Sequence, residues 1–378
     1  MAAAGFDPRA LARLRSAFAE RVDAGRIPGA VWLLGRDAVP EHVDCVGWQD
    51  AARTVALRED AIFRIRSMTK PIVSVAALVL FEQGRLRLAD PVARFVPEFA
   101  DVRVGVDGTV PMRPMTLHDL QRHTAGLTSE FGPPDPVRRR YVEADLASRG
   151  RSNAEFATCL AGLPLLYSPG TRWDYSRATD LLGRVLEVIA GAPLGDVLRT
   201  LVLEPLGMAD TGFSVDAGRA GRAAQAFAID PDTGAAVEPF DPLEPPRFES
   251  GGAGLLSTVR DYGRFARCLA GGGSLDGVRV LGRKTVAWMA SDHLGPIGHD
   301  GTVLPAGYGF GLGVAVRTAA GLGTDPASVG SYGWSGAVGS IFVVDPAERL
   351  HAVLMVQAPG QAAELWELFR SLVYAAVD

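Results

Sequence analysis

The two ends of this chain carry segments typical of β-strands, and this placement constrains the fold more than any other feature. Residues 30–34 and 42–48 lie near the N-terminus, and residues 340–345 and 351–356 lie near the C-terminus; all four are rich in apolar or β-branched residues. Helix-type patterns occupy much of the sequence between them. Strands that open and close a chain can pair in one antiparallel sheet, which leaves the helical middle as a second lobe.

Helical spacing and capping residues predict where the helices lie. Asp7 is a favourable N-cap for a first amphipathic helix, which we expect to end at Gly25. The sequence Thr116-Leu-His-Asp119 has the pattern of a capping box and predicts a short helix that Gly126 stops. Further helices are expected at residues 71–84, 178–190 and 361–376, with a loop at residues 131–136.

These elements together predict an α+β fold with two sub-domains. Residues 1–75 and 251–378 are expected to form a central antiparallel sheet with the N-terminal and C-terminal helices on one face. Residues 76–250 are expected to form a mostly helical sub-domain on the other side. A chain of 378 residues has room for two such units. We expect the active site in the cleft between them.

Composition excludes several classes of function. The formal net charge of −5 and the absence of long Lys and Arg runs argue against nucleic-acid binding. No stretch of about 18 apolar residues predicts a transmembrane helix, and charged residues interrupt the N-terminus before a signal-peptide core can form. These features predict a cytoplasmic protein that does not bind a membrane. Its oligomeric state is left open.

The cysteines and histidines show no pattern of a cofactor or metal site. Cys45, Cys159 and Cys268 are far apart and form no CxxC pair, which favours free thiols. The six histidines include no HExxH motif, and His123 is interpreted as structural. No phosphate-binding GxxxxGK[ST] motif occurs, and no complete GxSxG motif occurs either. We therefore expect neither a metal nor an organic cofactor.

Ser67 and Lys70 form the first candidate catalytic pair. Residues three apart on a helix share a face, and the strand-like residues 62–65 lead directly to Ser67. A serine at a helix N-terminus can present its hydroxyl and its backbone N–H to a reacting carbonyl. Lys70 lies between apolar stretches, where it can accept the serine proton. The alternative is a helix-capping serine beside a surface lysine.

Two later segments add further candidates. Residues 168–177 combine a Pro-Gly turn with aromatic residues, and Tyr175 there can exchange a proton if a cation lies near it. Residues 332–339 hold a glycine-rich stretch before a strand, where a ligand can approach the backbone closely. The N–H of Ala337 can then form an oxyanion hole with the N–H of Ser67. An ordinary packed tyrosine and an ordinary edge-strand turn are the alternatives.

The three segments together resemble the serine β-lactamase and penicillin-binding-protein superfamily. Its members carry SxxK, Tyr-x-Asn and Lys-Thr-Gly motifs in that order, and this chain has Ser67-Met-Thr-Lys70, Tyr175-Ser-Arg177 and Trp334-Ser-Gly336. Order and spacing are similar to the class C branch, and the resemblance runs from about residue 25 to the C-terminus. Connecting segments that look alike are residues 88–92, 120–127, 204–208 and 251–258. The resemblance implies a fold like that of D-Ala-D-Ala peptidases.

The departures from these motifs favour ester substrates. Arg177 replaces the Asn that helps β-lactamases hold a substrate amide, and Trp334 replaces the Lys of the third motif. A tryptophan there is similar to the family VIII carboxylesterases, whose third motif is commonly Trp-Gly-Gly. The resemblance thus implies a serine carboxylesterase acting on short-chain, small-molecule esters. Its catalytic residues are Ser67, Lys70 and Tyr175, and the substrate-binding candidates are Trp334, Ser335, Gly336 and Arg177.

Other activities remain open at this stage. A β-lactamase, a D-amino-acid peptidase or amidase, and an acyltransferase that passes the acyl group to an alcohol all belong to the same superfamily. A non-catalytic acyl-binding or sensor protein is disfavoured because Ser67, Lys70 and Tyr175 are all present. Which of Lys70 and Tyr175 acts as the base also stays open, because two close titrating groups share their protons.

Overall fold

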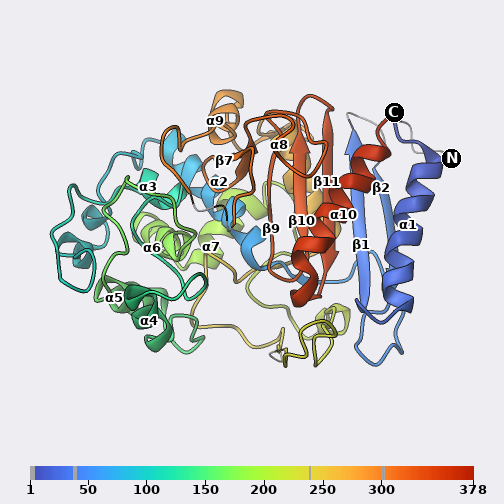
Figure 1. Ribbon diagram of the computed structural model, residues 1–378, viewed down its shortest axis with the longest axis horizontal. Helices are drawn as coiled ribbons and strands as arrows, with labels where there is room; N and C mark the ends of the chain where they lie inside the picture. Colours follow the sequence, from blue (N-terminus) through green and yellow to red (C-terminus); the bar gives the residue numbers. More distant parts are fainter. Residues whose placement is uncertain (1–4, 37–40, 238–239, 300, 302) are drawn as a thin grey trace.

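A seven-stranded antiparallel sheet, with strand order β2–β1–β11–β10–β9–β8–β7, dominates one half of the molecule (Figure 1). The computed structural model describes residues 5–36, 41–237, 240–299, 301 and 303–378. The strands are β1 (Gly29–Arg36), β2 (His42–Gly47), β7 (Tyr308–Phe310), β8 (Ala315–Arg317), β9 (Tyr332–Ser335), β10 (Ile341–Asp345) and β11 (Leu350–Val356). The strands expected at both ends of the chain are confirmed; the turn predicted around residues 36–40 lies mostly outside the described residues.

The two ends of the chain meet in this sheet, as predicted. Strand β1 pairs with β11 in antiparallel register, with Ala30 opposite Val356. Outside the sheet, the backbone N–H of Asp7 donates to the carbonyl of Ala376 over 2.9 Å. Gly5, the first described residue, consequently lies beside the C-terminal residue Asp378, and helices α1 and α10 lie at the same end of the molecule (Figure 1).

Alternation along the strands divides the apolar residues between the two faces of the sheet. Trp32 and Leu34 of β1 face a cluster with helices α1 (Pro8–Asp23) and α10 (Ala362–Ala375), where the Phe18 ring stacks on Trp32 at 5.5 Å. Val31 and Leu33 belong to a second core, on the face where α8 (Val259–Ala270) packs against β1, β10 and β11. The terminal helices thus share one face, as expected from the sequence.

The other half of the molecule is mostly helical, and several predicted elements are confirmed there. Helix α6 (Ala178–Ala190) has the predicted bounds. Thr116 and Asp119 form the predicted capping box of α3 (Leu117–Gln121), which ends before Gly126. The predicted loop at residues 131–136 leads to α4 (Pro136–Glu143). The other helices are α2 (Thr69–Glu82), α5 (Asn153–Ala161), α7 (Leu194–Leu198), the π-helical turn η4 (Arg199–Leu203) and α9 (Arg283–Met289).

One core runs through both halves. Buried residues of the sheet, such as Phe342, belong to the same apolar cluster as Leu182 in α6 and Val79 in α2. The expected boundary between residues 75 and 76 therefore falls inside helix α2, and one hydrophobic core extends across it. The sub-domain boundaries stay a prediction. The short elements are β3 (Phe63–Arg64), β4 (Leu256–Ser257), β5 (Ser274–Leu275), β6 (Val278–Arg279), η1 (Arg66–Met68), η2 (Val92–Arg94), η3 (Pro97–Ala100), η5 (Ala220–Arg222) and η6 (Pro359–Gln361).

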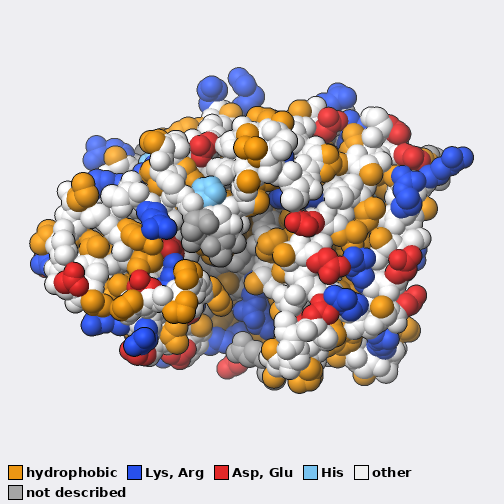
Figure 2. All heavy atoms as spheres, in the orientation of Figure 1, with side chains coloured by type: hydrophobic (Ala, Val, Ile, Leu, Met, Phe, Trp, Pro, Cys, Tyr) orange, Lys and Arg blue, Asp and Glu red, His pale blue; other side chains and the backbone are white. Residues whose placement is uncertain are grey.

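The surface is hollowed between the two halves in the space-filling view (Figure 2). Within the described part of the chain, no helix combines the length and the apolar character that crossing a bilayer requires.

Candidate active site

Ser67 and Lys70 lie together at the start of helix α2. Ser67 belongs to the 3₁₀ turn η1, and Lys70 lies in the first turn of α2. The Lys70 Nζ donates to the Ser67 Oγ over 3.3 Å and to the carbonyl oxygen of Gly252 over 2.8 Å. Lys70 is only 5% exposed, so its amine lies in a largely dehydrated environment beside the serine. The predicted serine–lysine pair is therefore present as a geometric contact.

Gly252 is positioned by helix α6. Its N–H donates to the Asp180 carboxylate over 2.9 Å. A side chain at Gly252 would bring its Cβ within 2.7 Å of the same carboxylate. A side chain at Gly252 would therefore displace the carboxylate that holds this segment, and Asp180 supports the lysine through the Gly252 backbone.

The turn that carries Ser67 is held by the backbone around Leu255. The Ile65 N–H donates to the Leu255 carbonyl over 3.1 Å, and the Leu255 N–H donates to the Thr69 hydroxyl over 3.1 Å. Arg66, which precedes the serine, has a positive φ of 48°. Such a φ is uncommon for a residue other than glycine and often marks functional sites.

Tyr175 covers Lys70 and contacts Trp334. The Lys70 Nζ lies 4.5 Å from the centroid of the Tyr175 ring. The indole N–H of Trp334 donates to the Tyr175 hydroxyl over 3.2 Å, and the two ring centroids are 5.3 Å apart. The structure thus brings together residues from all three sequence segments.

His123 supports Tyr175 from behind, a contact that the sequence analysis missed. Its ring centroid is 4.9 Å from that of Tyr175, and its Nδ1 accepts from the Ser176 backbone N–H over 3.3 Å. His123 is buried, and its φ is 56°. Burial, with a smaller effect of the Lys70 charge, lowers the pKa of His123 well below its usual value. The imidazole is therefore neutral beside the lysine. No sequence pattern indicated the contact between the His123 and Tyr175 rings.

The segment after strand β9 approaches the Ser67 turn closely. A Cβ on Gly336 would lie 2.4 Å from the Ile65 carbonyl oxygen, so this position requires glycine. Ala337 and Ser67 line one pocket. Neither of their backbone N–H groups donates to an acceptor among the described residues. Both groups are therefore available to a substrate oxygen, as the predicted oxyanion hole requires.

Arg177 takes a different position from the one expected. Its Nε donates to Glu130 over 3.0 Å, and its guanidinium also lies 3.5 Å from an Asp180 carboxylate oxygen. The side chain is 13% exposed and does not line the Ser67 pocket. Two carboxylates therefore already neutralise this arginine, which lies outside the lining of the Ser67 cavity. Sequence spacing did not predict the contact between Arg177 and Glu130, because the two residues are 47 positions apart in the chain.

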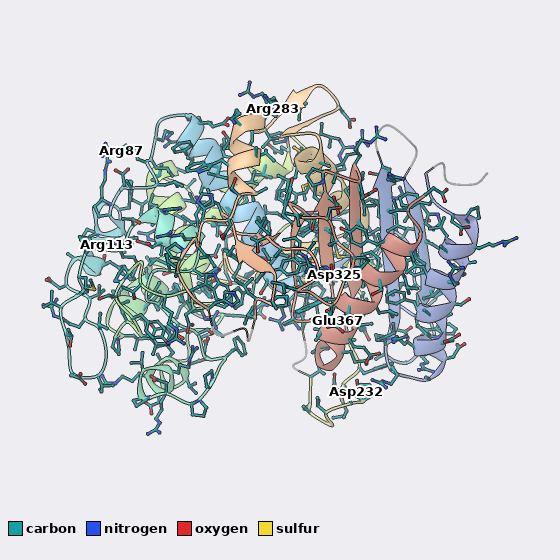
Figure 3. All side chains as sticks on the ribbon, turned by 45° about the horizontal axis from the view of Figure 1, so that its top comes forward. Arg87, Arg113, Asp232, Arg283, Asp325 and Glu367 are labelled. Carbon is teal, nitrogen blue, oxygen red and sulfur yellow. The ribbon has the colours of Figure 1, made fainter. Side chains whose placement is uncertain are left out.

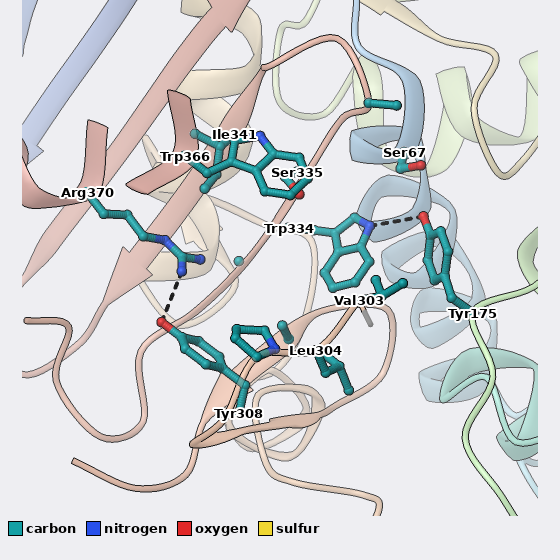
Figure 4. Close-up of a pocket in the computed structure, with 14 residues that line it drawn as sticks. Ser67, Tyr175, Val303, Leu304, Tyr308, Trp334, Ser335, Ile341, Trp366 and Arg370 are labelled. Atoms are coloured by element: carbon teal, nitrogen blue, oxygen red, sulfur yellow. Dashed lines mark hydrogen bonds between the residues drawn. The ribbon is translucent and has the colours of Figure 1, made fainter. Parts of the chain in front are cut away.

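A cavity of about 160 Å³ extends from Ser67 and Tyr175 along strand β9 to helix α10 (Figure 4). Trp334 and Ser335, both predicted substrate-binding residues, line it. The sequence analysis did not predict the opposite wall. The full lining is Ser67, Tyr175, Val303, Leu304, Pro305, Tyr308, Ala315, Gly333, Trp334, Ser335, Ala337, Ile341, Trp366 and Arg370.

No cluster of three or more metal-ligating side chains occurs among the residues that the structure describes. His118 and His293 lie in direct contact, with the Nε2 of His118 2.9 Å from the Nδ1 of His293. One ring donates to the other at that distance, so both partners are engaged without a metal.

Comparison with known proteins gives consistent matches along most of the chain. Residues 14–374 match the family model described as Beta-lactamase. Protein Rv1367c of Mycobacterium tuberculosis (strain ATCC 25618 / H37Rv) is 36% identical over 354 residues, which cover 89% of this chain and 88% of that protein. Esterase EstB of Burkholderia gladioli is 32% identical over 406 residues, covering 99% of this chain and all of EstB (100%).

Solved structures also match this chain over nearly its whole length. EstCE1, described as a hydrolase with promiscuous acyltransferase activity, superposes with a TM-score of 0.82 at 28% identity, covering 97% of this chain and 99% of EstCE1. A penicillin-binding protein homologue from Caulobacter crescentus has a TM-score of 0.74 at 22% identity, covering 98% of each chain. This second likeness concerns the fold alone.

Proposed function

This chain belongs to the Beta-lactamase family, and on that premise we propose that it is a serine carboxylesterase that hydrolyses short-chain carboxylic esters through an acyl-enzyme on Ser67. The resemblance and the fold expected from the sequence are thereby confirmed. The observation that carries the proposal is the meeting of Ser67, Lys70 and Tyr175 at one end of an apolar cavity. The relationship to EstB supports an ester as the substrate.

The first half of the proposed reaction forms the acyl-enzyme. The Ser67 Oγ attacks the ester carbonyl, and its proton passes to the Lys70–Tyr175 pair. The N–H groups of Ser67 and Ala337 stabilise the oxyanion of the tetrahedral intermediate. The carbon–oxygen bond to the alcohol then breaks, and the alcohol leaves with the proton from the pair.

The second half releases the acid. Water attacks the acyl carbon and gives its proton to the same pair, and the bond to the Ser67 Oγ then breaks as the serine regains a proton. Lys70 contacts both the Ser67 hydroxyl and the Tyr175 ring. We therefore assign the base to the pair rather than to one member.

The polar partners around Ser67 favour an ester over a β-lactam. A β-lactam carries a carboxylate beside its scissile bond. Trp334 occupies the position of the Lys expected to meet that carboxylate, and Arg177 occupies the position of the Asn that helps to hold the amide. Trp334 presents a ring and one N–H, which it donates to Tyr175. Arg177 is bound to Glu130 and Asp180. A missing charged hydrogen bond costs about 1.5–3 kcal/mol, or roughly ten- to a hundredfold in rate.

The proposal is tested by comparing kcat/KM for nitrophenyl butyrate with kcat/KM for hydrolysis of the lactam ring of a chromogenic cephalosporin. We expect the ester to be hydrolysed at least about tenfold more efficiently, because the lactam carboxylate lacks a charged partner. Equal or higher efficiency on the lactam ring would overturn the assignment in favour of a β-lactamase. A Trp334→Lys variant is expected to move the ratio toward the lactam.

Acyl transfer to an alcohol is the second candidate, favoured by the likeness to EstCE1. Both activities share the acyl-enzyme and differ in the acceptor that attacks it. Adding a simple alcohol during nitrophenyl butyrate turnover distinguishes them. Release of butyrate alone supports hydrolysis, whereas formation of a butyrate ester of the added alcohol as the main product supports transfer.

A further inference from the structure

We infer that the cavity between Ser67 and helix α10 is an acyl pocket, which takes an uncharged, compact acyl group about the size of a benzene ring. The inference rests on the proposed function and names the half of the ester that the cavity binds. Ser67 and Ala337 lie at one end of this acyl pocket, and Trp366 and Arg370 of α10 form the other (Figure 4). Its residues are those named above as the cavity lining.

The size of the acyl pocket limits the group that it admits. Its volume is about 160 Å³. An apolar cavity of about 150 Å³ in another protein stays dry and binds benzene. Val303, Leu304 and Ile341 contribute aliphatic walls, and Trp334 and Trp366 contribute aromatic ones. A branched or straight chain of up to about six carbons, or one phenyl ring, therefore fits without displacing the walls.

The charged residue at the far end is already neutralised. Arg370 donates from one nitrogen to the Tyr308 hydroxyl over 3.0 Å and to the Asp325 carboxylate over 3.1 Å. The Asp325 side chain is 5% exposed, and Tyr308 also donates to it over 3.0 Å. Figure 3 shows Asp325 beside helix α10. A substrate carboxylate in the acyl pocket would have to compete with Asp325, so the pocket favours an acyl group without a terminal charge.

The chemistry of the two half-reactions assigns this cavity to the acyl group rather than the alcohol. In the proposed mechanism, the acyl carbon is bonded to the Ser67 Oγ between the two half-reactions, and its oxygen accepts from the N–H groups of Ser67 and Ala337. Both residues line the cavity. The acyl group must therefore stay bound while water replaces the alcohol. Apolar contacts made by this group act in both steps, whereas contacts made by the alcohol are lost when it leaves.

Trp366 sets the depth of the acyl pocket in this account. It lies on α10 at the end opposite Tyr175, and it packs against the cluster between α10 and the sheet. Replacing its indole by a methyl group lengthens the cavity toward the body of α10. Leu368 is a matched control, because it lies on the same helix and packs against the same cluster but does not line the cavity.

The test is a series of nitrophenyl esters from acetate to decanoate, assayed with the wild type, Trp366→Ala, Trp366→Leu and Leu368→Ala. In the wild type, kcat/KM should rise by up to about fourfold for each added CH₂ that is buried. It should fall beyond hexanoate, and a hemisuccinate ester should be hydrolysed at least about tenfold less efficiently than butyrate because of its charge. Trp366→Ala should raise the octanoate-to-butyrate ratio at least about tenfold, the equivalent of two newly accommodated CH₂ groups. Trp366→Leu should raise it less, and Leu368→Ala should leave it unchanged.

A second series keeps butyrate as the acyl group and varies the alcohol from ethanol to octanol. The inference predicts that the two Trp366 variants leave the alcohol preference as it is in the wild type. It is overturned if folded Trp366→Ala or Trp366→Leu leaves the acyl-length ratio unchanged, or shifts the alcohol series instead. An enzyme that hydrolyses the esters but shows such a result fails this inference and keeps the proposed function, whereas hydrolysis of no ester at all removes both.

Discussion

The indole N–H of Trp334 donates a 3.2 Å hydrogen bond to the hydroxyl oxygen of Tyr175. The two residues come from different motifs and are 159 positions apart. Because the hydroxyl oxygen accepts from Trp334, its own proton remains available to another acceptor. Trp334 therefore has two roles in the proposed function. It replaces the lysine of the third motif, and it orients Tyr175, which exchanges a proton during catalysis.

Trp334→Phe is expected to lower turnover of nitrophenyl butyrate by about two- to tenfold, the value of one neutral hydrogen bond. The ring contact with Tyr175 survives in this variant, while the N–H donor is lost. Steady-state kinetics should place the loss mainly in kcat, because the hydrogen bond orients Tyr175 rather than the substrate. A loss confined to KM would show that Trp334 acts through substrate binding alone.

Lys70→Ala and Tyr175→Phe are each expected to lower turnover by at least about a hundredfold, the usual effect of a positioned acid or base. The chain provides a matched control, because its other lysine, Lys284, is exposed on helix α9. Tyr374 serves as the control for Tyr175, because it lies on helix α10, donates its hydroxyl to Asp345 over 2.7 Å and does not line the cavity. Lys284→Ala and Tyr374→Phe should keep wild-type turnover. Near-normal turnover by a folded Lys70→Ala or Tyr175→Phe enzyme, checked by circular dichroism, would remove that residue from the mechanism.

The burial of His123 predicts that the protein loses stability as the pH falls below about 6.5. Burial lowers the pKa of this imidazole in the folded protein well below its usual value. The unfolded chain therefore binds a proton that the folded chain does not bind. The free energy of unfolding therefore decreases as the pH is lowered, by up to about 1.4 kcal/mol per pH unit for one such group.

Urea unfolding between pH 7.5 and 5.5 measures this dependence, with His123→Asn as the comparison. Asparagine does not titrate and tolerates the positive φ at this position. The wild type should show the steeper loss of stability. The His118 pKa, lowered by burial to about 4, contributes with the same sign in both proteins. Equal slopes for wild type and variant would contradict the assignment of the loss to His123.

Incubation with EDTA is expected to leave ester hydrolysis unchanged, because the proposed chemistry uses only Ser67, Lys70, Tyr175 and backbone N–H groups. The measurement is the rate of nitrophenyl butyrate hydrolysis before and after chelation and gel filtration. Loss of activity that zinc restores would contradict the proposed mechanism.

Local sequence patterns predicted most of the fold. Helix α6 and the capping box at Thr116 follow from spacing and capping within a few residues, so their bounds could be predicted closely. The pairing of β1 with β11 followed from strands at both ends of the chain. The sub-domain boundaries stay a prediction, and helix α2, which contains one of them, carries apolar residues into a core that spans both halves.

The candidate site was predictable where it depends on local spacing or on motif order. Ser67 and Lys70 meet because they are three residues apart on a helical turn. Arg177 was placed differently because its partner Glu130 lies 47 residues away in the sequence. Trp366 reaches the cavity because of how α10 packs on the sheet. Amphipathic spacing shows that such a helix has a buried face, but not which of its side chains end beside a cavity.

The most direct test of the central claim is to label the enzyme with a fluorophosphonate probe and to map the adduct by peptide mass spectrometry. The account predicts one adduct, on the peptide that contains Ser67, formed in step with the loss of esterase activity. It also predicts that Ser67→Ala is folded, inactive on esters and unlabelled. Labelling of Ser335 or of any other serine in the wild type, or activity that survives in Ser67→Ala, would contradict it.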